Sequence, residues 1–192
     1  MKGPRRVAVT GVGVVAPGGV TREEFWGCLM SGRTATRRIT LFDPSPFRSR
    51  VAAECDFDPV AAGLSPRQIR RGDRYIQFAL AAASEAVADC GIEFDEATAN
   101  ATGVVLGTAV GGTTALETEY VVASDSGREW LVDPDHAAPF LYQALVPSSL
   151  AADVAAQFGT HGPAQVVSTG CTSGIDAIGY AFQLVSDGEA DV

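Results

Sequence analysis

The chain has 192 residues, and its 14 Lys and Arg residues against 23 Asp and Glu residues give a net charge of −9. This balance argues against a nucleic-acid binder, which needs basic surface to neutralise phosphates, and a hydrophobic content of 46% argues against disorder. No apolar run approaches the ~18 residues of a membrane span, and no signal-peptide core follows the basic N-terminus. We therefore expect a soluble, cytoplasmic protein.

The N-terminal half of the chain is predicted to contain a buried strand and two capped helices. Residues 6–11 have the apolar pattern of a strand, and a Thr-x-x-Glu capping box opens a helix over residues 21–32. Residues 33–63 are rich in Pro and Arg and should be irregular, apart from a short strand near residues 51–53. A second capping box, with Pro at the first helical position, starts one long helix over residues 65–91.

The C-terminal half alternates strands with helices. We expect strands at residues 102–107 and 164–168, and helices at residues 114–123, 147–159 and 172–186. This alternation indicates an α/β layered fold with both faces of the sheet covered. The last of these helices is almost wholly apolar over its first three turns, which is typical of a core helix.

The end of the sequence is predicted to begin another strand. Residues 190–192 follow a glycine turn and have strand-like composition, and the chain stops there. We therefore expect residues 1–192 to be a partial domain that is truncated at its C-terminal end.

A glycine-rich motif follows the first predicted strand. Residues 11–16 match G-x-G-x-x-A, a variant of the dinucleotide-binding fingerprint. That function requires a helix starting at the second glycine, but residues 17–19 are Pro-Gly-Gly and the capping box places the helix start at Thr21. A strand-to-loop turn is the favoured interpretation, and no cofactor site is predicted.

Cys171 is the strongest candidate for a catalytic residue. A predicted strand runs into a turn of small residues, Ser-Thr-Gly-Cys-Thr-Ser-Gly, and then into a helix. This position offers free backbone N–H groups and the positive end of the helix dipole, both of which favour a thiolate. Small neighbours give a substrate access to the sulfur, and the Cys171 N–H can donate to an oxyanion.

The other cysteines and the histidines suggest no further chemistry. The gaps between Cys28, Cys55, Cys90 and Cys171 match no metal-ligand spacing, so no metal site is predicted, and unpaired thiols fit a reducing compartment. A thiol nucleophile usually needs a histidine partner. Neither histidine of this chain has a catalytic context, and solvated loop positions are favoured for both, which are His136 and His161.

Four arginines are predicted to share one face of the long helix. The spacing of Arg67, Arg70, Arg71 and Arg74 places them together. A basic face on an acidic chain is suited to an acidic partner or a phosphate. A solvated face that pairs with Asp73 and nearby acids explains the pattern equally well, and the spacing alone leaves both interpretations open.

The sequence resembles the N-terminal part of a β-ketoacyl synthase of the thiolase fold, and more narrowly the ketosynthase α subunit of type II aromatic polyketide synthases. The resemblance covers essentially the whole chain. The segments that carry it are residues 6–18, 31–38, 42–46, 125–128 and the Val-Ser-Thr-Gly-Cys-Thr-Ser-Gly run at 167–174. It implies a layered α-β-α-β-α fold of which this chain holds the first part of the N-terminal half.

The resemblance also implies an activity and partners. Cys171 would accept an acyl or polyketide chain from an acyl carrier protein as a thioester and condense it with decarboxylated malonyl on the carrier. No cofactor is implied, because substrates arrive on the phosphopantetheine of the carrier. A chain length factor subunit would complete a heterodimer, and the carrier would contact Arg67, Arg70 and Arg71.

The family's catalytic histidines, its lysine and its Gly-rich oxyanion loop lie in later motifs that residues 1–192 do not contain. His136 and His161 do not match them. We therefore expect a fragment without condensing activity of its own, with the helix after Cys171 uncovered. A fatty-acid-type synthase and a non-catalytic ketosynthase-like partner are the alternatives. The similar chain length factor lacks this cysteine, so Cys171 favours the catalytic α subunit.

Overall fold

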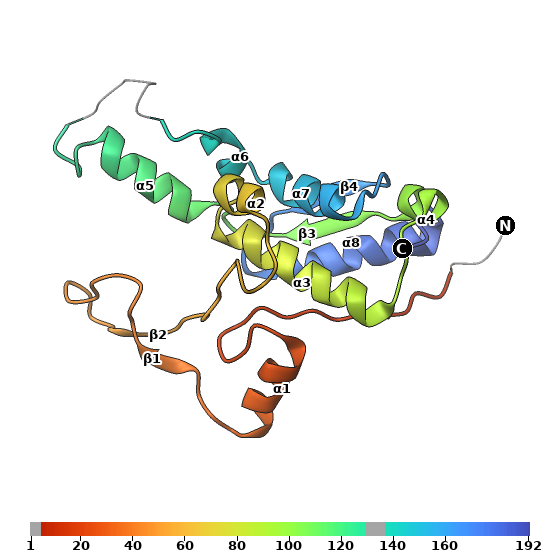
Figure 1. The fold of residues 1–192 in the computed structure, drawn as a ribbon, viewed down its shortest axis with the longest axis horizontal. Coiled ribbons are helices and arrows are strands. Elements are labelled where there is room, and N and C mark those ends of the chain that lie inside the picture. Colours follow the sequence, from red (N-terminus) through yellow and green to blue (C-terminus); the bar gives the residue numbers. More distant parts are fainter. Residues whose placement is uncertain (1–4, 130–136) are drawn as a thin grey trace. The chain divides into compact units, whose positions relative to one another are not determined.

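The computed structural model describes residues 5–129 and 137–192. Their helices and strands are labelled in Figure 1. The chain divides into two compact units. The larger unit comprises residues 5–9, 65–80, 93–129 and 137–192, and the smaller unit comprises residues 10–64 and 81–92.

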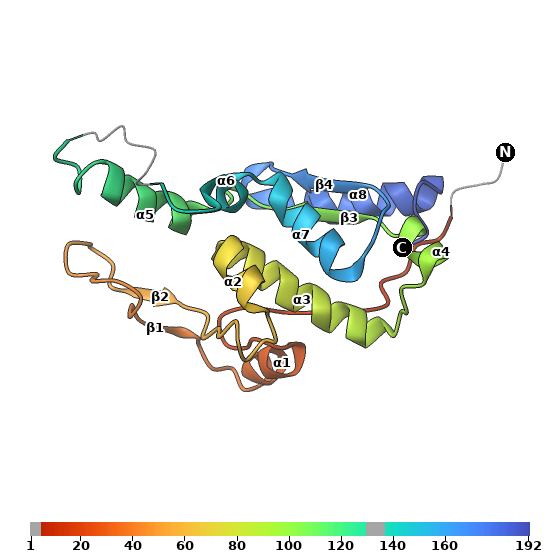
Figure 2. The ribbon, with the colours of Figure 1, turned by 45° about the horizontal axis from the view of Figure 1, so that its top comes forward.

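A parallel pair of strands organises the larger unit. β3 (Val104–Gly107) pairs with β4 (Ala164–Val167), with Val104 opposite Ala164 and Gly107 opposite Val167. α7 (Ser148–Phe158) and α8 (Ser173–Asp187) both pack on these strands, and Figure 2 shows them on opposite sides of the sheet. Parallel strands need a crossover connection, which the segment containing α7 supplies. The predicted strand–helix–strand–helix order of this region is confirmed.

The core of the larger unit consists of apolar side chains from the helices around this sheet. Ile76 and Leu80 of α3 (Arg74–Cys90) are 0% and 1% exposed. Further buried residues come from α7 and α8, namely Leu150, Ala151, Val154, Ala177 and Leu184.

Further helices lie between the main elements of the larger unit. α5 (Thr113–Ala123) was predicted almost to its bounds, whereas α4 (Glu96–Ala101) and α6 (Leu141–Leu145) were not predicted. Helices of five or six residues are too short to show the 3.6-residue apolar period on which the prediction depended. Within the described ranges, no helix has both the length and the apolar character needed to cross a membrane.

The single long helix predicted for residues 65–91 is wrong: the structure has two helices, α2 (Pro66–Arg71) and α3. The backbone at Gly72 is extended, with φ −98° and ψ 131°, and ends α2. Asp73 Oδ2 accepts a hydrogen bond from the Ala115 N–H at 2.8 Å, in the first turn of α5. The residue before that helix is a glycine without a capping side chain, so Asp73 supplies the missing cap from a distant part of the sequence.

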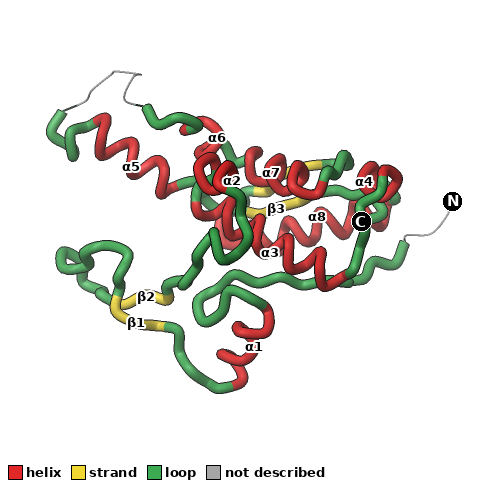
Figure 3. Tube along the Cα trace, viewed as in Figure 1, coloured by secondary structure: helices red, strands yellow, loops and turns green. Residues whose placement is uncertain are grey.

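The smaller unit contains little regular structure, as Figure 3 shows. α1 (Arg22–Met30) begins after a Thr21 cap whose side chain accepts from the Glu24 N–H, as predicted. β2 (Val51–Ala53) was also predicted, and it pairs antiparallel with β1 (Thr36–Arg38), which was not.

The buried carboxylate of Glu54 organises the loop beside these strands. It accepts hydrogen bonds from the backbone N–H groups of Thr40 at 2.9 Å and Leu41 at 3.1 Å. These bonds, together with those from the Thr40 hydroxyl and Arg37, lower the pKa of Glu54 to about 2. An ionised carboxylate therefore fixes the backbone of a segment that forms no strand.

The strand predicted at residues 6–11 is absent from the described structure. Backbone N–H groups just after this segment bond to side chains instead of to a neighbouring strand. Val12 donates to Asp89 Oδ2 at 3.0 Å and Val14 donates to Glu85 Oε2 at 2.8 Å. A strand requires a hydrogen-bonded neighbour, and here carboxylates of α3 satisfy the donors.

The strand predicted at residues 190–192 is likewise not formed. The Asp191 N–H bonds to the Ala101 carbonyl, and the Val192 carbonyl accepts from the Gly103 N–H, each at 2.8 Å. The segment therefore lies beside the residues that lead into β3, without a ladder of its own. The composition of residues 190–192 indicated an extended chain, but it could not indicate which segment this chain would pair with.

Candidate active site

Cys171 lies in the predicted strand–turn–helix. β4 ends at Val167, a short 3-10 helix covers Gly170–Thr172, and α8 begins at Ser173. Gly170 has φ +72°, a conformation that favours glycine and reverses the chain before the cysteine. The Cys171 side chain is exposed and its thiol is free. A nucleophile in this position is accessible to a substrate and adjoins the first turn of a helix.

Close packing against β3 sets the position of the turn. A Cβ placed on Gly107 would lie 2.2 Å from the carbonyl oxygen of Ser173, far inside van der Waals contact. Gly107 is the last residue of β3, and Thr108 continues the pairing by donating to the Val167 carbonyl at 3.1 Å. Only a residue without a side chain lets the end of β3 approach the start of α8 this closely.

Hydrogen bonds to side chains of α8 complete the turn. The buried Ser173 hydroxyl accepts from the Thr169 N–H at 2.9 Å and donates to the Gly170 carbonyl at 2.6 Å. The hydroxyls of Thr169 and Thr172 both donate to Asp176 Oδ2. Asp176 was not among the residues predicted from the sequence, although its four-residue spacing from Thr172 at a helix start was a visible signal.

α8 buries one face and exposes the other. Ala177 and Leu184 are 4% and 5% exposed, whereas Ile175, Ile178 and Phe182 remain 66%, 64% and 53% exposed. The prediction that the helix after Cys171 would be uncovered agrees with these values. The apolar composition of α8 is that of a core helix, but the described residues bury only one of its faces.

The predicted arginine face is divided between two helices. Arg67 and Arg70 are exposed on α2, and Arg71 is half-buried with its guanidinium 5.1 Å from the centre of the Phe140 ring. Arg74 belongs to α3, since the chain breaks at Gly72, so its assignment to the same helical face is wrong. Its guanidinium lies 4.9 Å from the centre of the Phe78 ring.

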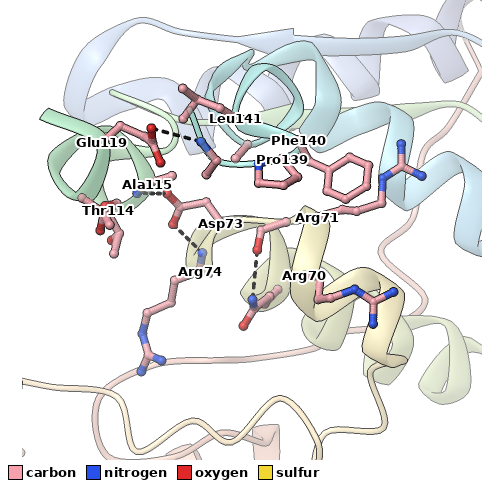
Figure 4. Close-up of a pocket in the computed structure, with 15 residues that line it drawn as sticks. Arg70, Arg71, Asp73, Arg74, Thr114, Ala115, Glu119, Pro139, Phe140 and Leu141 are labelled. Atoms are coloured by element: carbon pink, nitrogen blue, oxygen red, sulfur yellow. Dashed lines mark hydrogen bonds between the residues drawn. The ribbon is translucent and has the colours of Figure 1, made fainter. Parts of the chain in front are cut away.

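The three arginines of α2 keep their charges available. Within residues 5–129 and 137–192, none of them forms a salt bridge. Asp73, the partner that the solvated-face interpretation suggested, uses its carboxylate on backbone N–H groups instead, as Figure 4 shows. Arg71 and Arg70 also line a cavity of about 340 Å³ between α2, α5 and α6.

Asp153 of α7 is the acid that faces this surface. It lines a second cavity, of about 330 Å³, together with Arg67 and Arg71. Burial raises the pKa of Asp153, and the two cations offset only part of this effect. Asp153 nevertheless forms no salt bridge with Arg67 or Arg71 within the described residues, so both guanidinium groups remain open to a partner from outside the chain.

The structure does not bring His161 to Cys171. His161 is exposed in the turn before β4, where its N–H bonds to the Ala99 carbonyl at 2.9 Å, whereas Cys171 follows the other end of that strand. His136 lies outside the described residues. In the part of the chain that the structure describes, no group of three His, Cys, Asp or Glu residues is arranged to hold a metal ion.

The glycine motif at residues 11–16 serves packing. A Cβ on Gly11 would lie 2.1 Å from the Ala86 carbonyl oxygen, and one on Gly13 would lie 1.9 Å from the Ala82 carbonyl oxygen. Both glycines therefore allow the chain to run against the backbone of α3. The first helix after the motif is α1, which begins only at Arg22. The favoured interpretation as a structural turn agrees with this geometry.

Comparison with known proteins agrees with this architecture. The family model of the β-ketoacyl synthase N-terminal domain matches residues 4–192. The chain is 62% identical over 188 residues to "Putative polyketide beta-ketoacyl synthase 1" of Streptomyces cyaneus, covering 98% of this chain and 44% of that protein. It therefore spans less than half the length of this relative.

Two solved structures have the same fold. The ishigamide ketosynthase/chain length factor matches with a TM-score of 0.84 at 28% identity, over 97% of this chain and 45% of that one. The second structure is of a type II polyketide synthase acyl-carrier protein in complex with its ketosynthase bound to the hexaketide. One of its chains matches with a TM-score of 0.77 at 29% identity, over 97% of this chain and 43% of that one. The predicted thiolase-like ketosynthase fold is confirmed, and the chain belongs to the β-ketoacyl synthase family, whose N-terminal domain model matches residues 4–192.

Proposed function

We propose that this chain is the N-terminal part of the ketosynthase α subunit of a type II aromatic polyketide synthase, and that Cys171 is its nucleophile. The observation that carries this proposal is the exposed thiol on a glycine-dependent strand–turn–helix. Membership of the β-ketoacyl synthase family and identity to a polyketide synthase subunit support it. The cytoplasmic location and the absence of a cofactor remain predictions.

The reaction has two stages that both involve the Cys171 sulfur. The thiolate attacks the thioester carbonyl of a carrier-bound acyl chain, and the carrier thiol leaves. A malonyl group on a second carrier then loses CO2, and the resulting enolate attacks the Cys171 thioester. A carbon–carbon bond forms, the sulfur leaves as thiolate, and a β-ketoacyl chain remains on the carrier. The histidines that the resemblance implies for this chemistry are not His136 or His161.

Two partners belong to the proposal. An acyl carrier protein would deliver the substrates and contact Arg67, Arg70 and Arg71, whose charges have no salt-bridge partner among the described residues. A chain length factor would form a heterodimer with this subunit. The solved structures of similar ketosynthases include one with a chain length factor and one with an acyl-carrier protein.

The test of this function is acyl loading of Cys171. In a ketosynthase chain of full family length that contains residues 1–192, incubation with an acylated carrier should add the acyl mass to the Cys171 peptide. We expect Cys171→Ala to abolish the adduct and Cys28→Ala, which removes another free thiol, to retain it. Loading of the Cys171→Ala variant at the wild-type level would exclude the proposed nucleophile.

A further inference from the structure

Asp176 connects the first turns of α8 to both ends of the Cys171 turn. Its Oδ2 accepts the hydroxyl of Thr172 at 2.9 Å and also the hydroxyl of Thr169. These two threonines flank the Gly170–Cys171 dipeptide directly. One carboxylate oxygen therefore holds the residue before and the residue after the segment that presents the nucleophile.

We propose that Asp176 is a positioning residue for the nucleophile, and that its bonds to Thr169 and Thr172 hold Cys171 in the geometry that accepts an acyl group. This inference rests on the proposed function. Gly170 is a weak point of the turn, because it has φ +72° and nothing lies within 4 Å of where its Cβ would be. A glycine in open space has wide conformational freedom, so the two threonine bonds restrain a residue that packing leaves free.

The carboxylate acts here as an acceptor. Asp176 forms no salt bridge within the described part of the chain, and hydrogen bonds from Thr169 and then Thr172 lower its pKa. It is thus ionised at neutral pH, and a negative charge near a thiol opposes formation of a thiolate. The negative charge of Asp176 therefore cannot activate the sulfur, whereas its hydrogen bonds can still restrain the turn.

The shared oxygen gives a sharp test. Because both hydroxyls donate to Oδ2, the single oxygen of an Asn side chain can accept both bonds after the charge is removed. Asp176→Asn should therefore retain the restraint and Asp176→Ala should lose it. On the other side of the bond, Thr172→Ser keeps the hydroxyl and Thr172→Val removes it at nearly constant shape.

The experiment measures two rates in the full-length ketosynthase with its carrier. One is the rate constant for acyl transfer to Cys171, normalised to the fraction of enzyme that loads. The other is the rate constant for alkylation by iodoacetamide as a function of pH, which reports the thiolate. Misplacement of a reacting group by about 1 Å costs on the order of 100-fold in rate. We expect Asp176→Ala to slow acyl transfer at least about tenfold, with no upward shift of the alkylation pH profile.

The remaining variants determine the interpretation. Asp176→Asn and Thr172→Ser should load within about threefold of wild type, and Thr172→Val should be slowed like Asp176→Ala. Asp187→Ala, which removes an exposed carboxylate at the other end of α8, is the matched control and should load normally. If Asp176→Ala does not fold, the Thr172→Val and Thr172→Ser pair tests the restraint from the other side of the bond, through a hydroxyl that also lies 3.2 Å from the Thr169 carbonyl oxygen.

Two results would overturn the inference. One is wild-type loading by Asp176→Ala or by Thr172→Val. The other is an Asp176→Asn variant as slow as Asp176→Ala, which would assign the effect to charge. Cys171→Ala separates this inference from the proposed function. If the Cys171→Ala variant still loads, Cys171 is not the nucleophile and the proposed function fails. If Asp176→Ala alone loads normally, only the positioning role of Asp176 fails.

Discussion

The turn that carries Cys171 and the helix that carries Arg67, Arg70 and Arg71 hold their functional side chains in different ways. The turn is fixed by backbone packing at Gly107 and by side-chain hydrogen bonds on both sides of the cysteine. In α2, the capping box fixes the backbone, and only Arg71 has an aromatic neighbour. A covalent step depends on atomic placement, whereas docking of a charged partner depends on the field at the surface.

The acid of each region responds to its surroundings in the opposite direction. Hydroxyl donors lower the pKa of Asp176 beside the cysteine turn. Burial raises the pKa of Asp153 beside α2, even with Arg71 and Arg67 close by. The cysteine turn therefore uses an ionised carboxylate as a structural acceptor, whereas the carboxylate beside α2 is partly desolvated and forms no salt bridge with the arginines among the described residues.

The largest effect is expected from adding one carbon atom at Gly107. In Gly107→Ala the new Cβ would meet the Ser173 carbonyl at 2.2 Å, so the end of β3 and the start of α8 must separate. Overpacking of this kind costs about 1–3 kcal/mol, and we expect the upper end because the obstacle is backbone. Urea unfolding and acyl loading of the full-length protein should both show the loss.

Gly27→Ala is the matched control for this prediction. Gly27 lies inside α1 and nothing lies within 4 Å of its Cβ position. Exchange of a helical glycine for alanine stabilises by roughly 0.5–1 kcal/mol. A Gly107→Ala protein that unfolds and loads like wild type would show that the turn does not depend on the close approach of β3.

A second, smaller effect is expected from reversing the charges on α2. Replacement of Arg67, Arg70 and Arg71 by Glu should weaken binding of the acyl carrier protein about tenfold or more at low salt, and less as salt is added. Carrier affinity measured by calorimetry at two ionic strengths checks this. Acyl loading at saturating carrier should change little, because the cysteine turn is untouched.

The control for charge reversal makes the same change elsewhere. Replacement of the exposed Arg38, Arg48 and Arg50 of the smaller unit by Glu alters net charge equally. If both triple variants lose affinity equally, net charge and not the α2 surface governs docking. If neither does, the arginines of α2 form a solvated face.

The smallest effects are expected from the two carboxylates, and they have opposite signs. The lowered pKa of Asp176 means that its ionised form stabilises the fold above the usual Asp pKa of about 3.9, and that this contribution is lost as pH falls through the folded value. The raised pKa of Asp153 means that ionisation costs stability, and that this cost disappears as pH falls through its folded value.

Urea unfolding of Asp176→Asn and Asp153→Asn from neutral pH downward checks this contrast. At neutral pH, Asp176→Asn should be slightly less stable than wild type, since a neutral acceptor forms weaker hydrogen bonds, and Asp153→Asn should be slightly more stable. Both differences should shrink in acid, that of Asp153→Asn at the higher pH. Stability changes of the same sign in both variants would contradict the contrast.

The sequence determined the features whose signals lie within a few consecutive residues. The N-cap at Thr21, the capping box at Ser65, the glycine turn before Cys171 and the strands on either side of α7 appeared as predicted. At Thr21 the reciprocal bond of a capping box is replaced, because the Glu24 side chain accepts from the Val20 N–H. Each depends on local backbone preferences and local hydrogen bonds, which neighbouring residues specify. The family could also be predicted, because its motifs are runs of adjacent residues.

Tertiary structure decided the features in which distant segments meet. The chain breaks between α2 and α3 at Gly72, and Asp73 at this break caps α5, 42 residues away in the sequence. The N-terminal segment has no strand partner among the described residues, and the N–H groups just after it donate to Glu85 and Asp89 of α3. Gly107 must be glycine because Ser173 packs on it. The group that accepts from a backbone donor, or that fills the space beside a glycine, is whichever group the fold brings near. Local sequence does not specify that group.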